Sequence, residues 1–319
     1  MSTIPRTLRN AISQFCESVP GAEIARRAAF QSAQYRAGAA SQITAPADVA
    51  AYLTARLPAT FAAVSAALNH VRERAPEFHP ASMLDFGAGP GTASWAAVDT
   101  WPCIESVHMK DRSERFLAAA KFLADHSEHL GLRQAKIENV SPIDENGDYD
   151  LVVAAYVISE LSESDVTDVT ARLWSRCRGI LAIVEPGTPS GYQRMLRSRQ
   201  ALIERNAVIA APCATNQSCP LASPDWCHFA VRLPRSRDHM RAKGANVPYE
   251  DEKYSYVAAA RESVSLLRAS SRIIAPVNST KAGLRYHLCT GHGISDKEIL
   301  RRNRTEYRLH IRKKWGDAI

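Results

Sequence analysis

The spacing of apolar residues changes near residue 80. Before that point the chain is rich in alanine, and apolar residues recur every three to four positions, which predicts helices over residues 3–75. The spacing is seen at Val49, Tyr52, Leu53 and Leu57. Pro46 and Pro58 are expected to break or begin helices in this region.

From residue 82 onward, short apolar runs alternate with helical stretches. The runs 82–86, 106–110, 150–155 and 180–184 predict strands. Strands separated by helices indicate a parallel sheet with crossover helices, and hence an α/β fold. Beyond Pro186 the chain is rich in Pro, Cys and Arg, and the alternation is lost until a predicted β region near residues 272–289.

A glycine-rich turn, Gly87-Ala88-Gly89-Pro90-Gly91, follows the first predicted strand. Glycine tolerates positive φ and lets backbone N–H groups approach a ligand closely. The spacing G-x-G-x-G is tighter than the G-x-G-x-x-G of nicotinamide enzymes and resembles the first motif of class I S-adenosylmethionine methyltransferases. In this interpretation Gly87, Ala88 and Gly89 hold the methionine end of the cofactor, and Asp85 orients its amino group. An ordinary turn of an α/β protein is the alternative.

Two residues at later strand ends are further cofactor candidates. Asp111 ends the second predicted strand, where a carboxylate accepts hydrogen bonds from both ribose hydroxyls of an adenosine cofactor. Tyr156 follows the strand 150–155 and is expected either to face the methyl acceptor or to pack against the adenine or the sheet. Catalytic residues stay unassigned, because the nearest acids, Glu160 and Glu185, suit a helix cap or a structural acceptor equally well.

Length, composition and charge narrow the class of protein. The 319 residues are 45% hydrophobic and 23% charged, as in an ordinary globular protein. No apolar run reaches the roughly 18 residues of a membrane span, and the N-terminus lacks the apolar core of a secretory signal. We therefore expect no membrane association and a cytoplasmic location, or a mitochondrial one in a eukaryote. A monomer is expected, although no sequence feature fixes the oligomeric state.

The net charge of +7 is concentrated in two basic clusters. The first consists of Arg232, Arg235, Arg237, Arg241 and Lys243. The second consists of Lys297, Arg301, Arg302, Arg304, Arg308, Arg312, Lys313 and Lys314, with Tyr307 and Trp315 interleaved. Basic and aromatic groups together suit a phosphate backbone with some base stacking, which predicts RNA binding. A solvated charged face is the alternative for either cluster.

The seven cysteines are unevenly distributed. Cys16, Cys103 and Cys177 are isolated in the sequence. We expect each of them to be a small buried residue and not a metal ligand. Cys213, Cys219 and Cys227 follow one another with the spacing C-x5-C-x7-C, and Cys289 could supply a fourth thiolate. His228 and His287 are alternative ligands, although a histidine next to a ligating cysteine usually points elsewhere. Structural zinc sites usually take cysteines in pairs two to four residues apart, and no such pair exists here. The spacing favours an iron–sulfur cluster over zinc, and both remain open, as does the absence of a metal.

Taken together, these segments resemble the methyltransferase-like small-ribosomal-subunit assembly proteins of mitochondria and bacteria. The resemblance spans roughly residues 35–317. Besides the glycine turn and the three-cysteine loop, it is carried by the segments 52–60, 156–161, 184–189, 250–256 and 314–317. The cysteine loop followed by Glu250-Asp251-Glu252-Lys253-Tyr254 is far more specific than the glycine turn.

The resemblance implies a class I Rossmann-like methyltransferase sheet, a [4Fe-4S] cluster and a partner in the small ribosomal subunit or its rRNA. It maps the four cluster ligands onto Cys213, Cys219, Cys227 and Cys289. We expect an N-terminal helical region over residues 1–75, an S-adenosylmethionine-binding domain over 76–205, and a Cys-rich, basic, RNA-binding region over 206–319.

Two functions remain open at this stage. The first is S-adenosylmethionine-dependent methyl transfer to small-subunit rRNA. The second is a non-catalytic assembly factor that retains the cofactor pocket, which the absence of a recognisable acceptor motif after residue 155 favours. A zinc-bearing methyltransferase of small molecules is a third interpretation, in which the basic clusters serve solubility.

Overall fold

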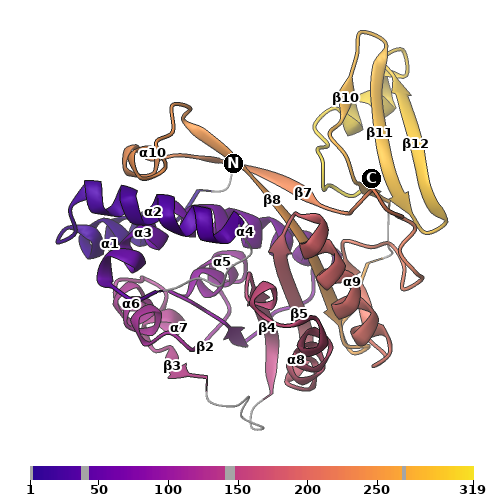
Figure 1. Cartoon of the computed structure of the whole chain (residues 1–319). Coiled ribbons are helices and arrows are strands. Elements are labelled where there is room, and N and C mark those ends of the chain that lie inside the picture. The colour runs from indigo at the N-terminus through magenta and orange to yellow at the C-terminus, as the bar shows by residue number, and fades with distance from the viewer. Residues whose placement is uncertain (1–2, 37–42, 141–147, 268–270) are drawn as a thin grey trace.

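A computed structural model describes residues 3–36, 43–140, 148–267 and 271–319, and its centre is a large mixed sheet (Figure 1). The strand order is β3-β2-β1-β4-β5-β8-β6, and β7 also pairs with β8. The parallel part consists of β1 (Ser82–Phe86), β2 (Ser106–Asp111), β3 (Lys136–Asn139), β4 (Tyr149–Ala155) and β5 (Cys177–Pro186). The antiparallel part consists of β6 (Val208–Ala211), β7 (Phe229–Pro234) and β8 (Tyr249–Ala260).

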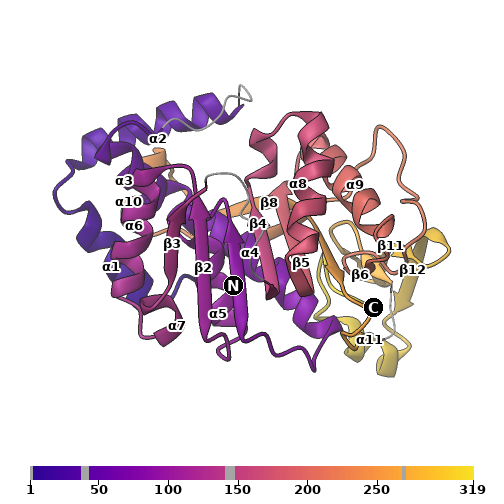
Figure 2. The ribbon, with the colours of Figure 1, turned by 90° about the horizontal axis from the view of Figure 1, so that it is seen from below.

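Helices cover both faces of this sheet, because successive side chains of a strand point to opposite sides. On β4, Leu151 and Val153 belong to one apolar core, whereas Val152 and Ala154 belong to the other. The first core packs against α5 (Thr92–Thr100), α6 (Glu114–Asp125) and α7 (Leu130–Arg133). The second core packs against η1 (Ile158–Glu160), α8 (Glu163–Ser175) and α9 (Pro189–Ile203), as Figure 2 shows from below. This arrangement confirms the predicted class I Rossmann-like methyltransferase fold.

The N-terminal region is helical, as predicted, for the residues that the structure describes; residues 37–42 lie outside them. It consists of α1 (Arg6–Cys16), α2 (Gly21–Arg36), α3 (Pro46–Ala55) and α4 (Leu57–Arg74). Pro46 and Pro58 lie in the first turns of α3 and α4, where the missing N–H group costs nothing. Among the described residues, no single helix meets the criteria for a membrane span; α3 and α4 meet them only as a pair bent by 49°.

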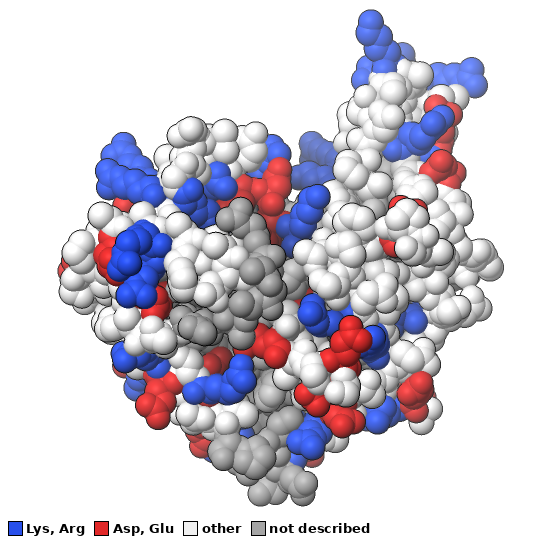
Figure 3. Space-filling model, viewed as in Figure 1, with Lys and Arg blue, Asp and Glu red and all other residues white. Residues whose placement is uncertain are grey.

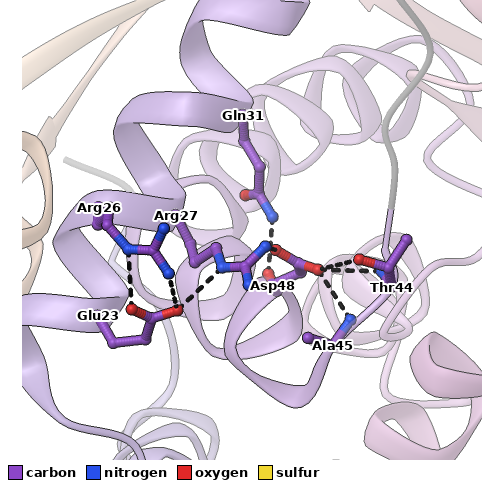
Figure 4. A network of polar contacts seen from close by, with 7 residues as sticks. All are labelled: Glu23, Arg26, Arg27, Gln31, Thr44, Ala45 and Asp48. Carbon is purple, nitrogen blue, oxygen red and sulfur yellow. Dashed lines mark hydrogen bonds and ion pairs between the residues drawn. The ribbon is translucent and has the colours of Figure 1, made fainter.

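A buried carboxylate joins α2 to the beginning of α3 (Figure 4). Asp48 is 1% exposed and accepts hydrogen bonds from the backbone N–H groups of Thr44 and Ala45, at 3.0 and 2.8 Å. Arg27 contacts Asp48 at 3.2 Å and Glu23 at 3.0 Å. The cation therefore compensates the charge that the fold buries at this helix start.

The C-terminal residues form a second, smaller sheet that projects from the main body (Figure 1). It consists of β9 (Arg272–Ile273), β10 (Asn278–Ser279), β11 (Gly283–Thr290) and β12 (Gly293–Leu300), followed by α11 (Arg304–His310). Its own small core is made by Ile273, Leu284, Tyr286, Leu288 and Ile299. The β region predicted near residues 272–289 is thus confirmed.

The expectation that strands and helices stop alternating after Pro186 is wrong. Residues 187–260 contain α9, β6, β7, α10 (Arg237–Lys243) and β8, and both β6 and β8 join the central sheet. The sequence hides β8 because its acidic first half resembles a surface loop, while its run Val257-Ala258-Ala259-Ala260 has the composition of a helix. Pairing with β5 and β6 on its two sides overrides that local preference.

Candidate functional site

The glycine turn leaves β1 at the carboxyl edge of the sheet and enters α5. Gly87, Gly89 and Gly91 all have positive φ, at 68°, 54° and 82°. A Cβ atom on Gly87 would clash with the Val157 side chain, so glycine is required there by packing as well as by backbone conformation. The Gly87 and Ala88 N–H groups donate to the Lys110 carbonyl at 2.8 and 3.0 Å, which ties the turn to β2.

Asp111, at the end of β2, is bound to the same turn. Its Oδ2 accepts a hydrogen bond from the Gly89 N–H at 2.8 Å, and its Oδ1 accepts one from the Ser113 N–H at 2.8 Å. Each carboxylate oxygen keeps a second lone pair, which can accept a hydrogen bond from a ribose hydroxyl. The fold thus brings together two predicted cofactor residues, Gly89 and Asp111, that are 22 positions apart.

Asp85 lies beneath the turn and is 1% exposed. Its Oδ2 accepts hydrogen bonds from the Ser94 N–H at 2.8 Å and the Ser94 hydroxyl at 2.7 Å, at the beginning of α5. Its Oδ1 is buried without a partner in the described part of the chain. Burial raises the pKa of Asp85 to about 7, against the smaller opposing effect of the Ser94 hydrogen bonds. An unpartnered buried oxygen is the acceptor that an ammonium group or a water molecule would satisfy.

Tyr156 follows β4 with φ at 58°, a conformation that only glycine adopts readily. Its hydroxyl donates to Glu252 Oε1 at 2.9 Å, and the Arg56 guanidinium lies 4.7 Å from the centre of its ring. Arg56 also binds both carboxylate oxygens of Glu252, at 2.9 and 3.2 Å. These contacts join the α3–α4 junction, β4 and β8 at one point on the carboxyl edge of the sheet.

The sequence did not single out Arg56 or Glu252 individually. Both lie within the segments 52–60 and 250–256 that carry the family resemblance. The signal available in the sequence was that one segment contains a cation and the other contains acids. Nothing in the sequence paired them, because they are 196 positions apart and only the docking of β8 beside β5 brings them together.

The two acids considered for catalysis differ in their surroundings. Glu160 forms a 2.6 Å ion pair with Arg112 at the protein surface. Glu185, at the end of β5, is 0% exposed and accepts a hydrogen bond from the Ile158 N–H at 3.0 Å. Burial raises the pKa of Glu185 to about 8, so that it is largely protonated at neutral pH. Its role in this structure is to hold η1 against the end of β5.

The four candidate ligand cysteines line one pocket. Cys213, Cys219 and Cys227 come from the irregular segment between β6 and β7, and Cys289 lies on β11 of the smaller sheet. Cys16, Cys103 and Cys177 are not among the residues that line it. Within the described residues, no three His, Cys, Asp or Glu side chains are arranged to hold a single metal ion.

Polar groups of α9 and the neighbouring loops surround this pocket. The Tyr192 hydroxyl donates to Cys219 Sγ at 3.1 Å. Arg199 donates to the carbonyl oxygens of Thr215 and Gln217 at 2.8 and 2.6 Å and so fixes the cysteine loop. Arg272, which is 4% exposed, donates to the Pro212 carbonyl at 3.1 Å. Burial raises the pKa of Cys213 and Cys227, and that of Cys289 to about 11.

The two basic clusters are not equivalent. In the first, Arg232 pairs with both oxygens of Asp251 at 2.7 Å, while Arg235 and Lys243 pair with Glu250 at 3.3 and 2.5 Å. This cluster is therefore largely neutralised within the fold, and the alternative of a solvated, internally paired face describes it better.

In the second cluster, most cations have no acidic partner among the residues that the structure describes. Lys297 pairs with Glu306 at 3.0 Å and Arg301 lies over the Tyr307 ring. Within the described residues, no ion pair involves the exposed cations Arg302, Arg304, Arg308, Arg312 and Lys314. Lys and Arg side chains are visible at the outer end of the projecting sheet (Figure 3).

Comparison with protein families and with curated proteins gives consistent matches. Residues 46–319 match the family model described as mitochondrial small ribosomal subunit Rsm22. The chain is 30% identical over 285 residues to the human ribosome assembly protein METTL17, mitochondrial, covering 84% of this chain and 61% of that protein. It is 26% identical over 209 residues to the Rsm22-cox11 tandem protein 2, mitochondrial, of Schizosaccharomyces pombe, covering 60% of this chain and 28% of that protein.

The chain thus spans less than two thirds of the length of either relative. Among solved structures, it is similar to the magnesium protoporphyrin IX methyltransferase of Synechocystis PCC 6803 with bound SAM. The TM-score is 0.42 and the identity 14%, with 82% of this chain and 100% of that chain covered.

Proposed function

Because the chain belongs to the family of the mitochondrial small ribosomal subunit protein Rsm22, we propose that it acts in assembly of the small ribosomal subunit. In this proposal it binds S-adenosylmethionine, contains a [4Fe-4S] cluster and contacts rRNA. It works where that subunit is made, in the cytoplasm of a bacterium or in the mitochondrion of a eukaryote. The similarity to a human protein that is named as a ribosome assembly protein supports the proposed role in assembly.

The single observation that supports cofactor binding most directly is the bond between Asp111 and the glycine turn. Gly87, Ala88 and Gly89 form the close-packed turn against which the methionine end lies, and Asp111 accepts hydrogen bonds from the ribose. The unpartnered Oδ1 of Asp85 is the acceptor for the amino group, directly or through water. When bound, S-adenosylmethionine supplies an electrophilic methyl group at this edge of the sheet.

The cysteine pocket fits an iron–sulfur cluster in the chemistry of its donors. Cys213, Cys219, Cys227 and Cys289 supply the four thiolates that such a cluster takes, from the segment between β6 and β7 and from β11 of the smaller sheet. Arg199 and Arg272 lie close enough to the cysteines to favour their negative charge. The cluster would fasten the smaller sheet to the main body, and zinc is the alternative occupant.

Binding without catalysis is the function that we propose first. The Tyr156 hydroxyl is bound to Glu252, and Arg56 covers the Tyr156 ring, so the residue next to the acceptor side already has partners. Methyl transfer to rRNA is the second candidate, favoured by the glycine turn and Asp111 together. It would break the bond between sulfur and the methyl carbon, form a new bond to a nucleophilic base atom, and release that atom's proton to solvent.

One experiment separates these candidates. The protein is purified anaerobically, its iron, sulfide and zinc are measured, and it is incubated with methyl-labelled S-adenosylmethionine and with immature and mature small subunits. We expect iron and sulfide in the protein and stable binding of cofactor and immature subunits, without label in the rRNA. Label in one rRNA fragment would establish methyl transfer instead. Zinc without iron, or no binding to small subunits, would contradict the cluster or the assembly role respectively.

A further inference from the structure

Three aromatic side chains gather where the segment before β7 meets the C-terminal segment. The rings of Trp226 and His228 are stacked, with centroids 4.9 Å apart and planes 18° apart. His228 meets Trp315 edge to face, at 4.9 Å and 76°. All three side chains are only partly buried, whereas the other tryptophans, Trp95, Trp101 and Trp174, are at most 3% exposed.

Backbone contacts hold these rings in place. Trp226 Nε1 donates to the Gly187 carbonyl at 3.1 Å, and His228 Nδ1 lies 3.2 Å from the Trp226 carbonyl. The Ser255 hydroxyl donates to the Cys227 carbonyl at 2.7 Å and thus fixes the segment between the two rings to β8. A stack that is ordered before binding loses little conformational entropy when a flat ligand joins it.

The C-terminal segment is fixed to the same place. Gly316, with φ at 97°, lies so close to β7 that a Cβ atom on it would be 3.4 Å from the Phe229 ring. Asp317 accepts a hydrogen bond from the Lys314 N–H at 2.8 Å and closes a turn around Trp315. The third ring is therefore held against the first two by the turn that follows α11.

Positive charge borders the rings. Lys253 on β8 is exposed, and its carbonyl accepts the Gly187 N–H at 3.0 Å, next to the carbonyl that binds Trp226. Arg312 and Lys314, also exposed, precede Trp315. Asp225 and Asp317 are the nearest acids in the sequence to Trp226 and Trp315, and Asp317 already accepts a hydrogen bond from the Lys314 N–H. A flat apolar surface flanked by cations matches a nucleobase with its neighbouring phosphates.

The position of the rings relates them to the rest of the site. Gly187 follows β5 directly, at the carboxyl edge of the sheet where β2 ends in Asp111 and β4 leads into Tyr156. The segment of the cation cluster 297–314 leads into Trp315. Arg312, Lys313 and Lys314 therefore adjoin the rings at one end of this cluster.

We propose that the stack of Trp226 and His228, bordered by Trp315, binds an unpaired nucleobase of RNA, with Lys253 and Lys314 contacting the adjacent phosphates. The inference rests on the proposed RNA contact and adds the place and the chemical unit that is recognised. Stacking on aromatic rings is tolerant of sequence but requires a base that is free of a duplex. This surface therefore distinguishes single-stranded from double-stranded RNA.

The test compares the full chain with its Trp226→Ala and Trp226→Phe variants. Both variants lose the indole N–H bond to Gly187, and only the phenylalanine variant keeps an aromatic face. Affinity is measured by fluorescence anisotropy with a labelled single-stranded RNA of about 12 nucleotides and with a duplex of the same sequence. Thermal unfolding of all three proteins shows that the variants fold.

We expect Trp226→Ala to weaken binding of the single strand about tenfold, as removal of one base–aromatic stack does, and to leave duplex binding unchanged. Trp226→Phe should stay within about threefold of the original chain. The slope of log K against log salt should be the same in all three, because every cation is retained. The single strand should also quench tryptophan emission of the original chain more strongly than that of Trp226→Phe.

Equal binding of the single strand by the original chain and Trp226→Ala would overturn the proposal while leaving the RNA contact intact. If the original chain binds neither RNA, the proposed RNA contact itself fails, and the nucleobase site with it. If Trp226→Ala binds RNA normally but no longer binds immature subunits, the rings contact a ribosomal protein, which also overturns the proposal.

Discussion

In the proposed function, Asp85 serves the cofactor at the expense of the stability of the fold. Its carboxyl group is buried and hydrogen-bonded on one oxygen only, and burial raises its pKa to about 7. The unfolded chain ionises this group near pH 4, whereas the folded chain keeps it protonated up to about pH 7. Within the described residues its other oxygen has no partner, which is what we expect if the proposed cofactor supplies one.

The shifted pKa of Asp85 predicts a dependence of stability on pH. Because the folded-state pKa is raised, the destabilisation is absent below about pH 4, grows between pH 4 and 7 and is complete above pH 7. We expect Asp85→Asn, which keeps an acceptor for Ser94, to gain relative stability over that interval by up to about 4 kcal/mol. Urea unfolding of both proteins at several pH values measures the difference. A difference that does not change with pH would contradict the assignment.

Asp111 carries the prediction for cofactor affinity. Asp111→Ala removes both the ribose acceptor and the bond to the Gly89 N–H, so S-adenosylmethionine should bind about 1–3 kcal/mol more weakly. Calorimetric titration measures this weakening. Asp125→Ala is a matched control, because Asp125 on α6 is exposed and its ion pair within the described residues is with Lys121 on the same helix. If Asp111→Ala binds S-adenosylmethionine with unchanged affinity, the proposed position of the cofactor at this edge of the sheet is wrong.

At the scale of elements, β8 connects the two candidate sites. Glu252 at its beginning binds Tyr156 and Arg56, whereas Ser255, Tyr256 and Val257 line the cysteine pocket. The strand pairs with β5, β6 and β7, so it lies in the interior of the sheet. One strand, paired on both sides, thus contributes residues to both candidate sites.

The contact between Arg56 and Glu252 is predicted to fasten the N-terminal helices to β8. Glu252 is 8% exposed, and Arg56 binds both of its carboxylate oxygens. In a double-mutant cycle with Arg56→Ala and Glu252→Ala, we expect a coupling free energy of about 1–3 kcal/mol. The control is the exposed pair of Arg232 on β7 and Asp251 on β8. The cycle with Arg232→Ala and Asp251→Ala should give a coupling free energy below about 1 kcal/mol. Equal coupling in the two cycles would contradict this role for β8.

At the scale of the whole molecule, the basic residues beside the two sheets differ in whether they have acidic partners. The cations near α10 are paired with acids of β8, whereas those around α11 face solvent on the smaller sheet. The smaller sheet has its own core and meets the main body beside the four cysteines. RNA affinity and the cluster are therefore expected to depend on the same attachment.

Salt dependence of RNA binding distinguishes the two basic clusters. Replacing Arg304 and Arg308 by Ala should lower the slope of log K against log salt by about 1–2, roughly one unit for each phosphate that is no longer neutralised. Replacing Arg232 and Arg235 by Ala is the matched control with the same change in net charge, and its slope should stay near that of the original chain. Equal effects of the two replacements would show that only net charge matters.

Cys219→Ser tests the attachment of the smaller sheet. Anaerobically purified variant should lose the visible absorbance of thiolate-ligated iron, and amide hydrogen exchange should rise in β11 and in residues 212–228. Cys103→Ser is the control, since Cys103 lies outside the pocket and contacts the Pro80 carbonyl. A variant that keeps its iron and its exchange rates would exclude Cys219 as a ligand.

The sequence by itself determined the elements whose signal is local. The glycine turn, the strands β1, β2, β4 and β5 and the helix starts at Pro46 and Pro58 follow from backbone conformation and side-chain periodicity, and the structure confirms them. The short edge strand β3 was not predicted. The spacing singled out Cys213, Cys219 and Cys227, the family resemblance mapped the ligands onto these three and Cys289, and their role as ligands stays a prediction.

Only the tertiary structure decided which distant residues meet. The placement of β8 between β5 and β6, the contact of Arg56 with Glu252 and Tyr156, and the neutralisation of the first basic cluster all join positions far apart in the chain. Local propensity cannot foresee such contacts, because their energy comes from pairing and burial that exist only once the sheet has formed.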